Sequence, residues 1–326
     1  MILPYGLRLA LLSAASFFVV YAAASLLVWA LVPALARRTG GRPAGRGADS
    51  LARWRLMPLA LAGFAVIALC VPGYLRFEPD ADAERAGALC TLAALLGAGI
   101  ILTGLARAGH AWWLSLRSAR EFRRGGRQIQ LPGEAMPVTA LESDAPLVAL
   151  TGVLRSRVVV SRGLLRALSS EQLEAALRHE QAHRTAGDNG KRLLFLLAPD
   201  PFGRMGRFAA LERSWARLAE WAADDRAAAG DARRALTLAE TLVLVARLGR
   251  PPVHCAVAAH LISDRSGLRE RVQRLVEFAG QPAEPAHPTG NLGFSLAILA
   301  GVLLVAAAWQ SPVLYSAHRV LEALLR

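Results

Sequence analysis

Two of the seven histidines of the chain stand four residues apart in the stretch LRHEQAHRTAGD. On a helix with about 3.6 residues per turn, His179 and His183 lie on one face, one turn apart, so both imidazoles can reach one metal ion. Glu180 is displaced by about 100° around the helix, where it can reach a water on the metal. This HExxH pattern predicts two ligands of a catalytic zinc ion and a general base.

A catalytic zinc site needs a third protein ligand beside an open position. In the stretch ERSWARLAEWAADDRAAAG, Glu220 can complete a site of two histidines and one glutamate from a second helix. Asp224 follows one turn later on the same face, where it can accept a hydrogen bond from a ligand histidine and fix its tautomer. Position alone leaves an alternative open, in which these histidines and acids are solvated residues on polar helix faces.

The elements that position these residues have recognisable signals. Ser169 and Gln172 have the spacing of a capping box ahead of the histidine helix, and Gly187 can end that helix near residue 186. Further helices are predicted at 208–229, from Asp231 to about 249, and at 268–279.

Ahead of these helices, the sequence predicts a small sheet. Three short β-prone runs are separated by turn residues, at Val138–Leu141, Leu147–Leu150 and Val158–Val160. The run around Leu147–Leu150 is the strand that we expect to pair with an extended substrate backbone, as in zincins generally. The chain from 125 to 142 is otherwise expected to be loop-like.

The chain as a whole has the composition of a membrane protein. Hydrophobic residues make up 54% of it and the mean hydropathy is +0.34. Four mainly apolar stretches of about 20 residues or more could each cross about 30 Å of hydrocarbon. These predicted spans are 9–35, 56–75, 86–106 and 291–314. The first is too long in its apolar core for a cleaved signal peptide.

The placement of arginines predicts the topology. The loop at 36–55 has six arginines and one acid, whereas the loop at 76–85 has two arginines and four acids. Arginine-rich loops stay in the cytoplasm, so we expect the N-terminus outside and the segment 107–290 inside. The expected location is the bacterial cytoplasmic (inner) membrane, in a multi-pass arrangement. Three transmembrane helices then fill 1–106, and a fourth with a short extracytoplasmic tail fills 291–326.

The net charge of +13 raises the alternative of nucleic-acid binding. The basic residues of the cytoplasmic segment are interspersed with acids, which positive-inside topology and attraction to anionic lipid explain. We therefore expect no nucleic-acid partner. The expected partners are the lipid bilayer and a protein substrate, and nothing in the sequence indicates an oligomeric state.

HExxH followed tens of residues later by ExxxD, in a loop between membrane helices, resembles the membrane gluzincins, and most of all the BlaR/MecR-type membrane metallopeptidases. GVLRSRVVVSRGLL at 152–165 resembles the stretch before the zinc helix of that family. LRERVQRL at 268–275 resembles an arginine-containing helix shared with HtpX-type and CAAX-prenyl peptidases. The layout matches over about 1–310, and the motifs match over about 150–275.

This resemblance implies a mainly α fold, with four transmembrane helices and a cytoplasmic zincin-like α+β metallopeptidase domain between the third and fourth spans. It implies Glu180 as the catalytic residue. The implied metal ligands, for Zn2+, are His179, His183 and Glu220. The implied neighbours of the ligands are Asp188, Asp224 and Arg271.

Two departures from the family limit what the resemblance implies. No SxxK or KTG motif follows the last span, so sensing of beta-lactams has no visible basis. Asp264, Arg265 and Ser266 stand where HtpX-type peptidases usually have His-Pro.

The expected function is a membrane-embedded, zinc-dependent endopeptidase that hydrolyses peptide bonds at the cytoplasmic face. The family analogy suggests regulated proteolysis or signal transduction, with a transcriptional repressor or a membrane protein as substrate. Two alternatives stay open: an HtpX-like protease for membrane-protein quality control, and a catalytically silent membrane scaffold or sensor.

Overall fold

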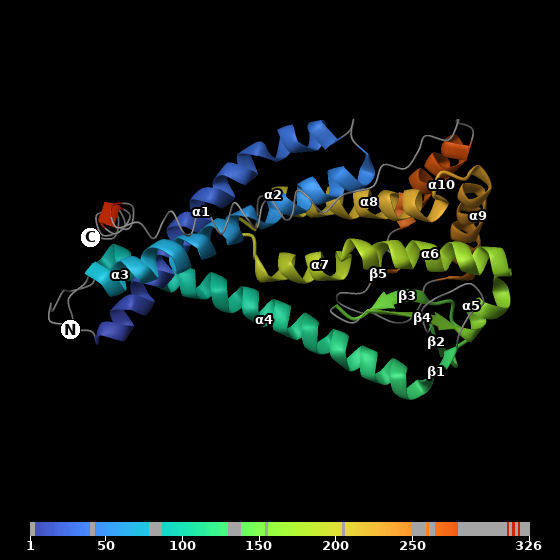
Figure 1. The fold of residues 1–326 in the computed structure, drawn as a ribbon, viewed down its shortest axis with the longest axis horizontal. Coiled ribbons are helices and arrows are strands. Elements are labelled where there is room, and N and C mark those ends of the chain that lie inside the picture. The colour runs from blue at the N-terminus through green and yellow to red at the C-terminus, as the bar shows by residue number, and fades with distance from the viewer. Residues whose placement is uncertain are drawn as a thin grey trace.

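A computed structural model describes eight segments of the chain and four single positions near its end. The segments are 4–39, 43–77, 87–129, 138–153, 156–203, 206–249, 259–260 and 265–279, and the positions are 312, 315, 316 and 319. Figure 1 shows an elongated, mainly helical molecule with one small sheet. The predicted fourth span at 291–314 and the tail after it lie almost wholly outside the described residues.

Three long apolar helices form one half of the molecule. Helix α1 covers Tyr5–Thr39 and α4 covers Ala88–Gly125. Between them α2, Ala44–Phe64, continues through a six-residue π-helix, η1 (Ala65–Cys70), into α3, Val71–Phe77. Helix α1, the continuous helix formed by α2, η1 and α3, and helix α4 are each long and apolar enough to cross a membrane, which agrees with the first three predicted spans.

These helices extend beyond the ends of the predicted spans. The expected loop at 36–55 is mostly helix, because α1 runs to Thr39 and α2 begins at Ala44. The helices continue because α2 has a tertiary partner: its small residues, such as Ala48 and Ala52, pack closely against α8. Helix α4 likewise runs about five turns past the predicted span, to Gly125.

The sheet has the order β1-β2-β4-β3-β5. Its strands are β1 Gly126–Ile129, β2 Val138–Leu141, β3 Val148–Thr151, β4 Arg157–Ser161 and β5 Ala259–His260. The three predicted strands are confirmed within one residue. The expected loop is wrong at β1, which has no apolar alternation and forms only because it pairs with β2 directly after α4.

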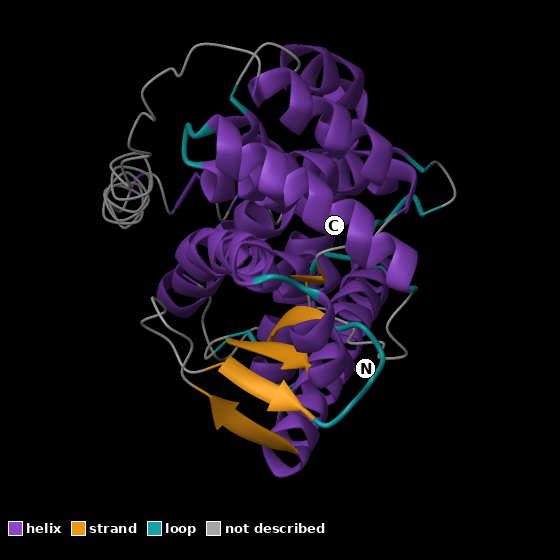
Figure 2. Cartoon of the chain, turned by 90° about the vertical axis from the view of Figure 1, so that its right-hand side faces the viewer, coloured by secondary structure: helices purple, strands orange, loops and turns teal. Residues whose placement is uncertain are grey.

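Alternate residues of the central strands face opposite layers. Val148 and Val160 pack with the core under α6, whereas Ala149 and Val159 pack with Phe122 of α4. The sheet therefore lies between α6 and the outer end of α4 (Figure 1), and Figure 2 shows it at one side of a mass of helices.

The remaining helices are α5 Arg162–Ala167, α6 Ser170–Ala186, α7 Asp188–Leu197, α8 Arg207–Ala228, α9 Ala232–Leu248 and α10 Arg265–Ala279. Helices α6, α8, α9 and α10 agree with the predicted helices, with α10 beginning three residues earlier, whereas α5 and α7 were not predicted. Both hydrogen bonds of the Ser169–Gln172 capping box form, and Gly187 ends α6 at a φ of 69°. Asp231 caps α9 by accepting from the backbone N–H of Arg234.

All three long apolar helices contact the C-terminal end of α7. Tyr21 of α1 donates to the carbonyl of Pro199 at 2.6 Å, and Arg55 of α2 donates to that of Ala198 at 2.6 Å. Gly104 of α4 lies so close that a Cβ there would be 2.4 Å from the carbonyl oxygen of Leu197. Helix α7 therefore ties the metal-binding part of the chain to the apolar helices.

Candidate metal centre

Helix α6 buries the HExxH residues completely. His179, Glu180 and His183 are each 0% exposed. The Nε2 atoms of the two histidines lie 3.1 Å apart, which their place on one face of the helix allows. Ala176 and Leu177, on the same helix, pack into the core beneath the sheet, which fixes the rotation of α6 and so the direction of the histidines.

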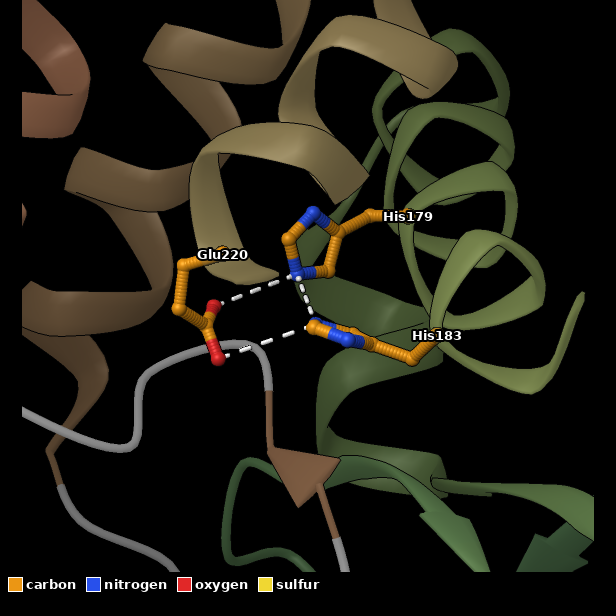
Figure 3. Close-up of side chains that lie close together, drawn as sticks. All are labelled: His179, His183 and Glu220. Atoms are coloured by element: carbon orange, nitrogen blue, oxygen red, sulfur yellow. Dashed lines mark hydrogen bonds and ion pairs between the residues drawn. The ribbon is translucent and has the colours of Figure 1, made fainter. Parts of the chain in front are cut away.

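Glu220 reaches the same point from α8. Its two carboxylate oxygens lie 3.5 Å from Nε2 of His179 and 3.6 Å from Nε2 of His183. One ligand atom from each residue falls within 4.8 Å of the others. In Figure 3 the two imidazoles of α6 and the carboxylate of α8 point toward one another.

The residues present fit a metal ion. Both carboxylate oxygens of Glu220 are buried, and among the described residues neither accepts a hydrogen bond, although Arg271 forms an ion pair with one of them. A buried carboxylate without hydrogen bonds is costly unless something compensates its charge. Two imidazole nitrogens and one carboxylate oxygen form the ligand set of many catalytic zinc sites. The group can therefore hold a metal ion.

Two acids orient the histidine rings. Nδ1 of His179 lies 3.0 Å from Asp224, and Nδ1 of His183 lies 2.7 Å from Asp188. Each contact places the proton on Nδ1 and leaves Nε2 free to bind metal. Both acids were predicted in this role, and the structure brings them to it.

Arg271 of α10 joins the two acids of α8. Its Nε and Nη2 donate to Asp224 at 2.8 and 2.7 Å, and its Nη1 lies 3.0 Å from Glu220. Its side chain is only 6% exposed, so the charge is neutralised inside the protein. Both acids engage this guanidinium, so Arg271 serves to position Glu220 and Asp224.

These contacts set the charge of the acids. Burial alone would raise the pKa of Glu220, but the charge of Arg271 and the two histidines outweigh burial and hold that pKa well below its ordinary value. Burial would raise the pKa of Asp224 too, and Arg271 again lowers it. Both carboxylates are therefore ionised at neutral pH.

Glu180 has the opposite balance. Burial raises its pKa to about 7, because the charges of His179 and His183 only partly offset the loss of solvent. Its carboxylate oxygens have no hydrogen-bond partner among the described residues. A carboxyl group with a pKa near neutrality can both accept and donate a proton at working pH.

Sequence reasoning missed a polar link from this centre to α2. Lys191 of α7 lies 3.6 Å from Asp188 and donates to Asp49 of α2 at 2.8 Å. Asn189 donates to the carbonyls of Leu150 and Gly152, which fastens the end of β3 to α7. The spacing of Asp188 and Lys191 could have suggested one pair, but no signal connects Lys191 to Asp49, 142 residues away.

The predicted substrate strand is already paired in this structure. Ala149 and Leu150 of β3 pair antiparallel with His260 and Ala259 of β5. The expectation that this edge is free for substrate is therefore wrong here, because a segment more than 100 residues later reaches the same edge.

The family comparison agrees with the site. The model of Peptidase family M48 matches residues 117–277, which include every residue of the proposed centre.

Individual relatives point the same way. A protein named "Protease HtpX homolog" from Chlorobium phaeobacteroides (strain BS1) is 32% identical over 154 residues, which cover 41% of this chain and 50% of the relative. A protein of the same name from Chlorobium phaeobacteroides (strain DSM 266 / SMG 266 / 2430) is 33% identical over 123 residues, or 31% and 40% of the two chains. One from Chlorobium luteolum (strain DSM 273 / BCRC 81028 / 2530) is 48% identical over 56 residues, or 17% and 19%.

The chain thus matches half or less of the length of these relatives. Their names favour the HtpX-like relationship, which sequence analysis held as an alternative, and do not show a BlaR/MecR-type peptidase. In site geometry, family match and apolar helices, this chain is similar to membrane metallopeptidases. The segment that carries the centre, residues 117–277, matches the model of Peptidase family M48, which covers just under half of the chain.

Proposed function

We propose that this chain is a zinc-dependent endopeptidase that hydrolyses peptide bonds of protein substrates at the cytoplasmic face of a bacterial inner membrane. The observation that carries the proposal is the buried triangle of His179, His183 and Glu220, with Glu180 beside it and free of hydrogen bonds. A silent scaffold would have no reason to keep the buried carboxylate of Glu180 without a hydrogen bond, since this lowers stability.

The residues divide the chemistry between them. A zinc ion on the three ligands would supply Lewis acidity toward a water and a peptide carbonyl. Glu180, with a pKa of about 7, takes the proton of the attacking water and returns it to the leaving amine nitrogen. Asp224 and Asp188 keep the two imidazoles in the tautomer that leaves Nε2 free.

The side of the membrane follows from charge. Arg37, Arg38, Arg46 and Arg53 are exposed near the C-terminal end of α1 and in the first half of α2. These parts of α1 and α2 lie at the same end of the apolar helices as the peptidase domain, since α2 packs on α8. Short arginine-rich connections stay in the cytoplasm, which supports a cytoplasmic domain.

The role in the cell that we propose is proteolysis at the membrane, with a membrane protein as substrate. Helices α1, α2 and α4 all contact the C-terminal end of α7, and these contacts support the proposal because they hold the metal centre close to the bilayer. Regulated proteolysis of a repressor, as the resemblance to BlaR/MecR-type peptidases implies, would use the same centre.

The test compares metal content with cleavage in the full chain purified in detergent. Wild type should hold about one zinc per chain, and the double variant His179→Ala, His183→Ala should hold none. Glu180→Gln should keep the metal and lose cleavage of a model protein, because glutamine cannot accept a proton. Glu220→Gln should instead weaken metal binding. Cleavage by Glu180→Gln at the wild-type rate would remove the general-base assignment.

A further inference from the structure

A cavity of about 550 Å³ opens beside the metal centre, between α8 and α10. Glu220 and Arg271 form its inner wall, so the proposed metal site and the cavity are continuous. Along α8 the wall continues through Arg217 and Arg213, and from α10 comes Glu270. The mechanism above uses none of these last three residues.

The two arginines stand at defined distances from Glu220. Arg213, Arg217 and Glu220 follow one another at four and three residues, so they share one face of α8. At a rise of about 1.5 Å per residue, Arg217 is about 4.5 Å and Arg213 about 10.5 Å from Glu220 along the axis. An extended peptide advances about 3.3 Å per residue, so these distances correspond to about one to three residues from the bond at the metal.

Neither arginine has an acidic partner among the described residues. Arg213 and Arg217 are exposed, and neither has an ion pair within the described segments. Arg217 lies 5.5 Å from the ring of Trp221, which supports its side chain against the wall. Glu270 also has no ion pair among the described residues.

Exposed arginines of the domain occur both with and without an acid within 4.0 Å: Arg162 and Arg166 have one, whereas Arg184 and Arg247 have none among the described residues. What distinguishes Arg213 and Arg217 is their place in the wall of the cavity that also contains Glu220. Two guanidinium groups in one cavity, with no acidic partner among the described residues, form a positively charged subsite, and guanidinium groups suit carboxylates in both charge and geometry.

The cavity is lined by α8 as far as Ala210, near the N-terminal end of that helix. The N-terminal end of α8 packs on them: Phe208, Leu211 and Trp215 share a core with α1 and α2, and Arg207 stacks on Trp29 at 3.7 Å. A segment that leaves the membrane near this end would pass Arg213, then Arg217, then Glu220.

We propose that this cavity is a substrate subsite in which Arg217 and Arg213 bind acidic side chains one to three residues from the cleaved bond. The proposal rests on the proposed endopeptidase function and names its substrate class. Cytoplasmic segments next to membrane spans are mainly basic, so such a subsite would select a minority of them. Exposed ion pairs are each worth a few-fold in affinity, and two together predict a preference of about fivefold to twentyfold.

The test measures cleavage by the full chain in detergent with peptides that differ at one position. Asp, Ala or Lys is placed in turn at each of the three positions on either side of the bond. Wild type should prefer Asp over Lys on one side, and the preference should shrink as salt rises. The variant Arg213→Glu, Arg217→Glu should reverse it. Unchanged ranking in that variant would overturn the proposal.

Three further variants keep the test sharp. Arg247→Glu changes an exposed arginine of α9 outside the cavity and should leave the ranking as in wild type. Glu270→Gln removes the lining acid that is not a proposed metal ligand and should strengthen the preference for Asp. If the double charge reversal fails to bind zinc, Arg213→Gln and Arg217→Gln should each lower the preference separately.

A binding measurement separates the subsite from the enzyme function. Labelled Asp and Lys peptides are titrated onto Glu180→Gln protein, which should bind without cleavage. Asp-selective binding that needs both arginines, with no cleavage by wild type, would overturn the endopeptidase and support the subsite. Cleavage by wild type with no dependence on either arginine would overturn the subsite alone. Loss of Asp selectivity in phosphatidylglycerol vesicles, compared with phosphatidylcholine, would assign the arginines to lipid phosphate and also overturn it.

Discussion

The two histidines of the metal centre differ in what holds the ring nitrogen that faces away from the metal. His179 contacts Asp224, whose other partner is Arg271, and the side chains of both are at most 6% exposed. His183 contacts Asp188, which lies next to Lys191. The side chain of Lys191 is 21% exposed and pairs with Asp49, whose side chain is 51% exposed. One network ends inside the peptidase domain, and the other leads out to α2.

This difference separates two tasks. A closed set of buried charges must be complete, because removing one member leaves the others without compensation. An ion-pair chain that reaches solvent tolerates the loss of a member, since water replaces it. We therefore expect the His179 side to determine whether the domain folds, and the His183 side to connect the centre to the apolar helices with little effect on stability.

The largest effect should come from Arg271→Met. It leaves Glu220 and Asp224 buried as carboxylates without their cation, which typically costs about 3–5 kcal/mol. Unfolding of the metal-free protein by denaturant in detergent measures the loss. Arg274→Met is the matched control on the same helix: Arg274 pairs with the partly exposed Asp225, so we expect about 1 kcal/mol. Equal losses would show that burial does not separate the two networks.

Glu180 belongs to neither network, and its effect should depend on pH. Its pKa is raised to about 7 in the folded protein, from an ordinary 4.5. The folded state then binds the proton more tightly, so metal-free protein loses stability as pH rises from about 4.5 to 7. Glu180→Gln avoids this loss. The stability of the variant relative to wild type should therefore rise by about 3 kcal/mol over that range, and a flat difference would contradict the raised pKa.

Metal affinity should respond next. Asp224→Asn and Asp188→Asn each remove an acid that orients a ligand, which typically costs about 10–100-fold. Asp224→Asn should lie at the upper end, because it also leaves Arg271 with one acid fewer. Competition with a chelator gives both values on the same protein preparation. A greater loss of metal affinity for Asp188→Asn than for Asp224→Asn would show that the His183 side, not the His179 side, is the more tightly held.

The sequence was sufficient to predict which residues of the centre lie on the same face of one helix. His179 with His183, and Glu220 with Asp224, are one turn apart, and Ser169 and Gly187 mark the ends of the histidine helix. These signals are local, and the structure agrees with them.

What the sequence did not predict depends on contacts between distant segments. Arg55 reads as one more arginine of a cytoplasmic loop, yet it is buried and donates to Glu212, 157 residues later. Strand β5 likewise pairs with β3 from a distant part of the chain. Charge counting cannot distinguish an exposed arginine from one buried against a remote acid. Local periodicity does not reveal which strand will occupy a sheet edge.

The smallest effect should come from the link between the two halves of the molecule. Asp49→Asn removes the partner of Lys191 on α2 and leaves Asp188 and His183 untouched. Because Asp49 is half exposed, we expect at most about 1 kcal/mol in stability and a change of less than about fivefold in metal affinity, both reduced by salt. Asp144→Asn, which breaks an exposed pair with Arg166 far from the centre in sequence, controls for loss of any surface ion pair. If Asp49→Asn weakened metal binding as much as Asp188→Asn, while Asp144→Asn did not, the His183 side would be controlled from α2. The open network would then transmit the state of a membrane helix to a metal ligand.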